Sequence, residues 1–230
     1  MEHFSWFTLL GLDKYDHVLG AILVVLFLIF ASYRIKKSLS ERKEAVLPDE
    51  KFSLRNIFEI LAIDFLLDLL TGMFGSKEKA KRYFPLLATT FFFILFANLL
   101  GLIPGFLPPT GNFNIPVACA LVIFVMYNYY GFKEHGISYL KHFTGPVLFL
   151  APLMVIIEFV SHLVRPVSLS LRLFWNMTGD HLVLGIFTNL THFLVPVVFI
   201  ALAIFVAFLQ AFIFMILSAI YIALSIAHEH

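Results

Sequence analysis

Five long apolar runs alternate with short polar segments along the chain. A helix crosses the hydrocarbon core of a bilayer with about 20 residues. The runs therefore predict transmembrane helices over residues 17–33, 85–103, 115–132, 146–187 and 193–226. The last two runs exceed a single perpendicular crossing, which predicts long, tilted helices that form an antiparallel hairpin.

A sixth segment, residues 53–75, mixes leucine and phenylalanine with charges at spacings of four or five. This pattern predicts an amphipathic helix along the inner membrane surface, with Asp64 and Asp68 as solvated charges. The expected fold is an all-α integral membrane protein. It has one membrane domain over residues 1–230, with five transmembrane helices and this interfacial helix.

The composition agrees with a lipid environment. Hydrophobic residues make up 60% of the chain and charged residues 13%, and the mean hydropathy is +0.93, outside the usual range of soluble proteins. A net charge of +1 gives no indication of nucleic-acid binding. Cys119 is the single cysteine, which excludes an intrachain disulfide and any paired-cysteine metal or haem site.

The basic residues predict the orientation. Most Lys and Arg residues lie in segments 34–43, 77–82 and 133–141, whereas segments 104–114 and 188–192 contain none. Because basic loops stay on the cytoplasmic side, we expect the N-terminus outside and the C-terminus inside. The first run is predicted to be a retained helix, since its basic flank follows it and no cleavage site closes it. Short inner loops and the absence of a presequence favour a bacterial inner membrane.

The fourth run carries a permanent charge, Arg172, near its centre. A charge at the middle of a bilayer costs about 3 kcal/mol or more, so it indicates a function. At about 100° per residue, further residues share the face of Arg172 to within roughly 40°. They are Glu158, Ser161, Arg165, Ser168, Asn176 and Gly179, with Asp180 at the edge of the face. Hydrogen bonding between helices explains the serines as well as a functional role does, but it does not explain the charged residues.

The chemistry of the guanidinium limits the roles that Arg172 can have. Arginine does not deprotonate in proteins, so it cannot carry a proton, but it can keep a nearby carboxylate ionised. Glu158 and Asp180 can titrate, and they lie on opposite sides of Arg172 along the helix. This order predicts two half-pathways separated by a fixed charge. Such a barrier needs a moving partner with its own carboxylate to carry the ion past it.

The last run supplies a second polar face. Gln210 lies near the middle of this run, at the depth expected for Arg172 in an antiparallel neighbour. Its amide could orient the guanidinium or an incoming carboxylate. Tyr221 shares this face with Ser218 and Ser225, for which hydrogen bonding between helices is an equal alternative.

These two runs resemble a known family. PVSLSLRLFWNMTGD (166–180) and LQAFIFMILSAIYIALSIAHEH (209–230) closely resemble the two terminal helices of subunit a of F-type ATP synthases. FANLLGLIP (96–104) and NIPVACAL (114–121) resemble two earlier family segments, and the resemblance covers about residues 17–230. It implies a non-catalytic stator subunit with two offset half-channels. These channels load and unload protons on the carboxylates of a rotating ring of c subunits.

The resemblance also implies residue roles and partners. Arg172 would be the arginine that faces the ring, with Gln210 as its neighbour on the last helix. The outer half-channel would use Asn176 and Asp180, with Asn98 and Asn114 near its mouth, and the inner one Glu158 and Ser168. The implied partners are the c ring, the subunit b peripheral stalk, the rest of the ATP synthase complex and membrane lipids. No cofactor or metal is implied, and the polar C-terminal end is typical of the family.

Five positions depart from the family pattern or leave a choice open. Asp180 stands where glutamate is frequent, and Ala203 stands where many members have histidine. His181 could supply a similar proton relay, or it could only form a hydrogen bond at a helix interface. Trp175 replaces a frequent glycine, which nothing in the sequence explains. His162 is interpreted as a packing residue or as a partner of a lipid headgroup.

Other function classes fit less well. For an intramembrane enzyme, Ser168 and His181 would lie about 18 Å apart on one helix, too far for a nucleophile and its base. A self-contained ion-coupled transporter predicts an internal repeat, which the chain lacks. A passive scaffold does not explain the arginine. Sodium as the coupling ion stays open, because the coordinating carboxylate would belong to the ring. ATP chemistry would lie elsewhere, since the chain has no phosphate-binding loop.

Overall fold

A computed structural model describes Trp6, Gly11, Tyr139 and residues 15–41, 65–103, 105–136, 151–190 and 194–226, without the side chains of residues 35–41, 151, 181, 187–190 and 194–196. The elements are α1 (Asp16–Glu41), α3 (Asp68–Phe74), α4 (Lys77–Leu100), the short 3₁₀ helix η4 (Pro109–Gly111), α5 (Asn114–His135), α6 (Ala151–Leu190) and α7 (Leu194–Ile226). Within these ranges, five helices are long and apolar enough to cross a membrane, and residues 65–74 form a shorter apolar helix. The predicted all-helical fold with five long apolar helices is confirmed.

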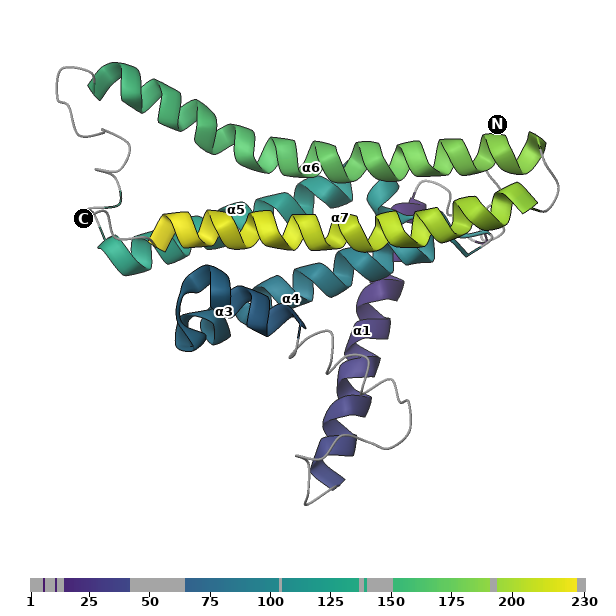
Figure 1. The fold of residues 1–230 in the computed structure, drawn as a ribbon, viewed down its shortest axis with the longest axis horizontal. Coiled ribbons are helices and arrows are strands. Elements are labelled where there is room, and N and C mark those ends of the chain that lie inside the picture. Colours follow the sequence, from purple (N-terminus) through teal and green to yellow (C-terminus); the bar gives the residue numbers. More distant parts are fainter. Residues whose placement is uncertain are drawn as a thin grey trace.

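The helices α4, α5, α6 and α7 form a bundle, and α1 leaves it at a steep angle (Figure 1). The most extensive contacts join α4 to α7 and α5 to α6, while α1 packs on α4 and η4. Pro85, expected at the start of a crossing, lies inside α4, which begins at Lys77. The second half of the predicted 53–75 helix is present from Phe65 onward, whereas Asp64 lies outside the described residues. Its position on the inner surface stays a prediction.

A row of alanines lets α7 approach its neighbours closely. Ala203, Ala207, Ala211 and Ala219 are all buried, and their spacing in multiples of four places them in a row that winds slowly around the helix, by about 40° for every four residues. Small residues at such spacing allow helix backbones in a membrane to pack closely. Asn98 on α4 lies 3.5 Å from the Ala207 carbonyl oxygen, so the row lies next to α4. Ala203 is thus a packing residue here.

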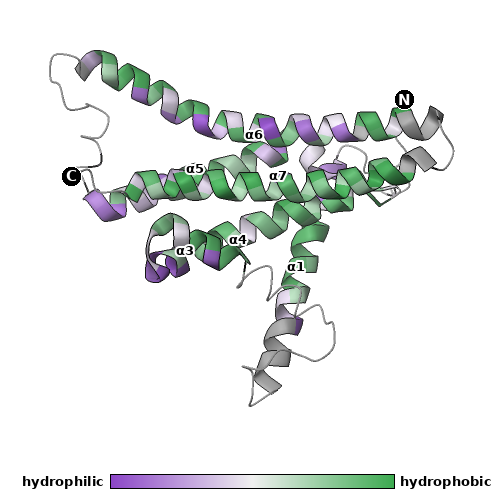
Figure 2. Cartoon of the chain, viewed as in Figure 1, coloured by the Kyte–Doolittle hydropathy of each residue, from purple (hydrophilic) through white to green (hydrophobic). Residues whose placement is uncertain are grey.

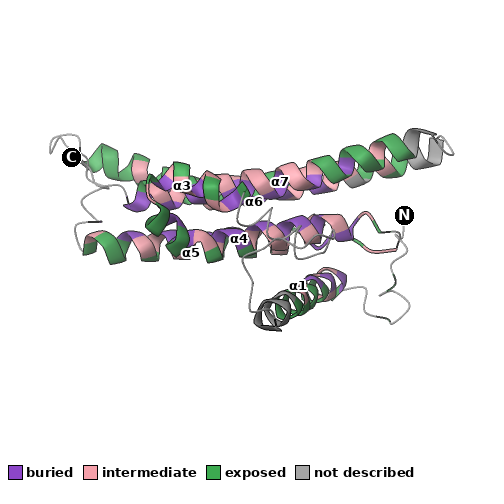
Figure 3. Ribbon diagram, turned by 60° about the horizontal axis from the view of Figure 1, so that its bottom comes forward, coloured by how far each residue is buried: buried purple, intermediate pink, exposed green. Residues whose placement is uncertain are grey.

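The α6 helix bends away from the bundle toward its N-terminal end (Figure 1). Pro166 lies inside this helix, and it removes the backbone hydrogen bond that residue 166 would donate to the carbonyl of His162. A proline is the usual cause of such a bend. The N-terminal side chains from Pro152 to Ile157 are exposed, whereas Leu169, Leu173 and Met177 after the proline are buried. The second half of α6 is therefore the part that docks on the bundle. Figure 3 shows this division of buried and exposed positions along the helices.

The segment between α4 and α5 is anchored inside the bundle by one hydrogen bond. Thr110 donates from Oγ1 to Oδ1 of Asn98 at 2.6 Å, and both side chains are buried. Gly20 of α1 allows Pro109 of η4 to approach, because a Cβ at residue 20 would lie 2.9 Å from Pro109 Cγ. These contacts hold η4 against α1 and α4.

We expect Thr110→Val to destabilise the protein by about 1–3 kcal/mol, because it leaves the buried Asn98 oxygen without its donor. Unfolding in mixed detergent micelles, followed by circular dichroism, measures the change. Thr89→Val on exposed α4 surface is the control and should leave stability unchanged. Equal stability of the two variants would show that water replaces the lost hydroxyl.

Candidate ion-translocation site

The polar stripe lies on α6 as the sequence predicts, and none of its described side chains is buried. Arg172 and Ser161 are exposed, while Glu158, Arg165, Ser168 and Asn176 are intermediate. Figure 2 shows hydrophilic positions distributed along α6, whereas α7 is hydrophobic over almost its whole length. The buried Leu169, Leu173 and Met177 dock the helix, so the stripe lies to one side of that docking face.

Arg172 is the exposed charge of this stripe. The described residues provide no hydrogen bond or ion pair to its guanidinium. Exposed apolar side chains surround it on the same helix, with Val167 and Trp175 51% and 64% exposed. A charge exposed within an apolar surface needs a partner outside the chain, because the alternative is lipid.

Among the described residues, no hydrogen bond joins Gln210 to Arg172. Its side chain is buried at 7% exposure on α7, between Ala207 and Ala211 in the alanine row. The predicted role of its amide in orienting the guanidinium stays a prediction. Ser218 and Ser225 donate to carbonyl oxygens of their own helix, at 2.7 and 2.8 Å, so these bonds do not join helices.

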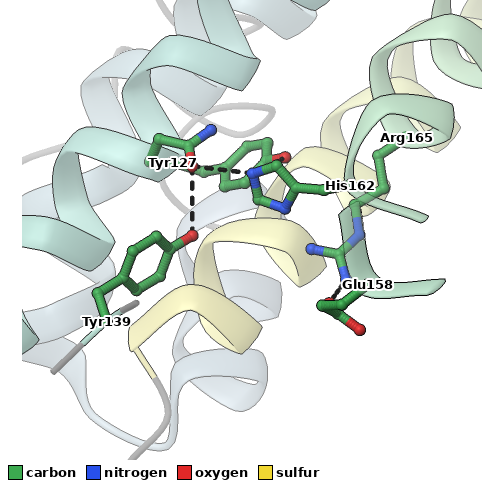
Figure 4. Close-up of polar contacts among 6 residues, drawn as sticks. Tyr127, Tyr139, Glu158, His162 and Arg165 are labelled. Atoms are coloured by element: carbon green, nitrogen blue, oxygen red, sulfur yellow. Dashed lines mark hydrogen bonds and ion pairs between the residues drawn. The ribbon is translucent and has the colours of Figure 1, made fainter. Parts of the chain in front are cut away.

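The N-terminal half of the stripe contains an ion pair that the sequence reading did not predict. Arg165 Nη2 lies 3.4 Å from Glu158 Oε1 (Figure 4). The guanidinium of Arg165 also lies over the ring of Tyr221, 5.7 Å from its centroid. Tyr221 was expected to share a face with Gln210, and the structure places it against the second arginine of the stripe. The spacing of seven residues between Glu158 and Arg165 was the available signal, since it returns to nearly the same face of a helix.

A hydrogen-bonded cluster of α5 and α6 lies beside this ion pair (Figure 4). His162 is buried, and its Nε2 lies 2.9 Å from Asn128 Oδ1 and 3.1 Å from the Tyr127 hydroxyl. Tyr139 donates its hydroxyl to the same Asn128 oxygen at 3.3 Å. This confirms His162 as a packing residue rather than a headgroup partner. The cluster was missed because its members come from separate segments of the sequence.

Two features keep Tyr139 in this cluster. Gly131 of α5 leaves room for it, since a Cβ at residue 131 would lie 2.5 Å from a carbon of the Tyr139 ring. Burial raises the pKa of the Tyr139 hydroxyl, which therefore stays protonated and able to donate. The asparagine oxygen consequently has two donors available, one from Tyr139 and one from His162.

The C-terminal part of α6 has polar atoms without partners. Asp180 Oδ2 and Thr178 Oγ1 are buried and have no hydrogen-bond partner among the described residues. Native proteins pair most buried polar atoms with protein or water, so such atoms in a membrane helix favour a hydrated path. The side chain of His181, the candidate relay beside Asp180, lies outside the described residues.

The two asparagines expected at the outer mouth differ in environment. Asn98 is buried and bonds to Thr110 and the Ala207 carbonyl, which gives it a structural role between α4, η4 and α7. Asn114 is exposed at the start of α5, where its backbone N–H donates to Asn112 Oδ1 at 3.1 Å. Only Asn114 is therefore accessible from outside the bundle in this structure.

Comparison with known proteins identifies one family along nearly the whole chain. Residues 17–223 match the family described as ATP synthase A chain. The chain is 46% identical over 232 residues to ATP synthase subunit a of Bdellovibrio bacteriovorus, covering 99% of both proteins. It is 44% identical over 236 residues to ATP synthase subunit a 1 of Syntrophotalea carbinolica, covering 100% of this chain and 95% of that protein. With subunit a of Geobacter sulfurreducens, 54% identity covers 66% of this chain and 67% of that protein. This multi-pass membrane protein belongs to the ATP synthase A chain family.

Proposed function

We propose that the chain is the proton-conducting stator of an ATP synthase, with two offset half-channels that meet at Arg172. The observation that carries this function is Arg172 itself, a permanent charge exposed on an apolar helix without a partner in the described chain. The chain takes no part in ATP chemistry. Its task is to pass protons to and from a ring of c subunits whose carboxylates move past α6.

The chemistry of the guanidinium supports a separator. Arg172 attracts a ring carboxylate and favours its ionised form, so a proton bound there leaves before the carboxylate passes the arginine. Because arginine does not give up its own proton, no proton crosses directly from one side to the other. The ring therefore has to turn for a proton to complete the crossing.

The order of polar residues along α6 supports an assignment of the two half-channels. With the N-terminus outside and the C-terminus inside, Asp180 and Asn176 lie on the outer part of α6, with Asn114 at the mouth. Glu158 and Ser168 lie on the inner part. The buried, unpartnered Asp180 oxygen supports a hydrated outer path. Gln210 serves the meeting point from α7, and the subunit b stalk and membrane lipids cover further surfaces of the bundle.

The energetics require many carriers. One charge moved through 100 mV provides about 2.3 kcal/mol, so several ions are needed for each ATP, which a ring of many carboxylates can collect. Sodium in place of the proton is the alternative coupling ion, and the ring carboxylate decides between them. The bacterial relatives support a bacterial inner membrane as the location.

The proposal predicts that the stripe faces the ring. In a Cys119→Ser background, a cysteine replaces the exposed Ser161 of α6 or, as the matched control, the exposed Val125 of α5. Each cysteine carries a photoreactive maleimide in the assembled complex, and mass spectrometry identifies the captured protein. We expect residue 161 to capture c subunits and residue 125 to capture none. Capture of c subunits from residue 125 alone would place the ring on the wrong side of the bundle and refute the proposal.

A further inference from the structure

The stripe contains a second permanent charge between Glu158 and Arg172. Residues 158, 165 and 172 are spaced by seven, so their backbone positions follow one another at intervals of about 10 Å along nearly one helix face. Any proton that moves between the ring carboxylate near Arg172 and the N-terminal end of α6 passes Arg165. The net charge around Arg165 therefore affects proton movement through the inner half-channel.

A carboxylate neutralises the charge of Arg165, and an aromatic ring holds its guanidinium in place. Its guanidinium lies 3.4 Å from the Glu158 carboxylate and 5.7 Å from the Tyr221 ring centroid. The Tyr221 ring is 6.2 Å from that of Tyr127, and Tyr127 in turn contacts His162 at 3.1 Å. The ion pair thus rests on an aromatic ring of α7, which packs in turn on Tyr127 of the α5–α6 cluster.

We propose that Glu158 is the counter-ion of Arg165, and that its role is to neutralise this charge rather than to carry protons. The inference rests on the proposed function, because it concerns the inner half-channel. Glu158 and Arg165 are then positioning residues: the neutral pair leaves the inner path open to a cation, whereas a lone guanidinium repels it.

The geometry favours this role over a proton relay. A carboxylate that relays protons has to be free to face the path, whereas the Glu158 carboxylate is engaged with the Arg165 guanidinium at 3.4 Å. The side chains of the pair are 24% and 31% exposed, so the charges are partly screened by solvent. At an effective dielectric constant of about 20, one uncompensated charge about 10 Å away still changes the rate at which a cation moves along the path about tenfold.

A double-mutant cycle tests the proposal in vesicles containing the whole complex. Glu158→Gln is expected to lower ATP-driven proton pumping about tenfold, because Arg165 loses its counter-ion. Arg165→Gln is expected to stay within about threefold of wild type, since a lone carboxylate can be neutralised by protonation whereas a guanidinium cannot. The double variant with both changes should recover pumping to within about threefold of wild type. A charge swap, Glu158→Arg with Arg165→Glu, restores a neutral pair and should also pump.

The matched control is the ion pair between Arg82 and Glu134, at 3.6 Å between α4 and α5. Glu134→Gln also leaves an arginine without its carboxylate but does so away from the stripe, and it should pump like wild type. Immunoblots of subunit content correct each rate for assembly. If Glu158→Gln assembles poorly, the charge-swapped protein decides, because it removes the carboxylate from position 158 while keeping the pair.

Each remaining outcome overturns the inference. A double variant and a charge swap that stay as slow as Glu158→Gln would make Glu158 a proton relay. Wild-type pumping by Glu158→Gln would make the pair a surface contact without effect. Arg172→Ala in the same vesicles keeps the two questions apart: if that variant pumps, the proposed function fails, and if it does not, failure of rescue concerns the Arg165–Glu158 pair alone.

Discussion

Replacing Arg172 with alanine is expected to abolish ATP-driven proton pumping while proton leak persists. Without the guanidinium, a ring carboxylate passes from one half-channel to the other with its proton still bound, and nothing separates the two paths. Pumping should fall below about 1% of wild type, the size of effect seen when one essential electrostatic group is removed from a site. Vesicles with the whole complex report acidification by a pH-sensitive dye. Vesicles stripped of the catalytic head report passive leak, which should equal or exceed that of wild type.

The control for this variant is Val167→Ala, an exposed apolar position on the same helix. It should pump and leak like wild type, which excludes a general effect of shortening a side chain on α6. Pumping at the wild-type rate by Arg172→Ala would show that the charge is structural. Loss of both pumping and leak would show that Arg172 lies inside a conducting path rather than between two paths.

Replacing Asp180 with asparagine is expected to have the second largest effect, with the opposite sign for leak. Asparagine keeps the shape of the side chain but cannot release a proton, and a proton-transfer group typically contributes about a hundredfold or more to a rate. Pumping should fall by about that factor. Leak in stripped vesicles should fall as well, because the outer path itself is interrupted. The same two dye measurements give both values.

Asp180→Glu restores a titratable carboxylate and should recover most of the pumping. Val183→Ala, at an exposed position of the same helix, should leave both values unchanged. If Asp180→Asn pumps normally, the unpartnered oxygen at this position reflects packing, and the outer path runs through other residues such as His181. If it leaks more than wild type, Asp180 acts as a barrier.

The helices and the stripe could be predicted from the sequence because both depend on local patterns. Five apolar runs are long enough to span a bilayer, and the recurrence of Arg172 with Asn176, Ser168 and Glu158 follows from helix periodicity alone. These predictions need no knowledge of how the helices pack. The family resemblance depends on contiguous residues and is local in the same sense.

The contacts between helices could not be predicted in this way. The bond between His162 and Asn128 joins α5 and α6, and only their packing brings the two residues together. Likewise, the contact between the Tyr221 ring and the Arg165 guanidinium depends on how α7 packs against α6. The burial of Gln210 against the exposure of Arg172 also depends on how the two helices are rotated.

The alanine row on α7 decides where outer proton chemistry can be located. At position 203, where many family members have histidine, α7 presents a methyl group within a tightly packed seam, so α7 supplies no titratable side chain at this position. The groups proposed to exchange protons in the outer path, Asp180 and His181, are adjacent residues of α6. In the proposed outer route, the titratable groups thus belong to a single helix, and a shift of α6 along its axis would displace Arg172 and these groups together, with their spacing preserved.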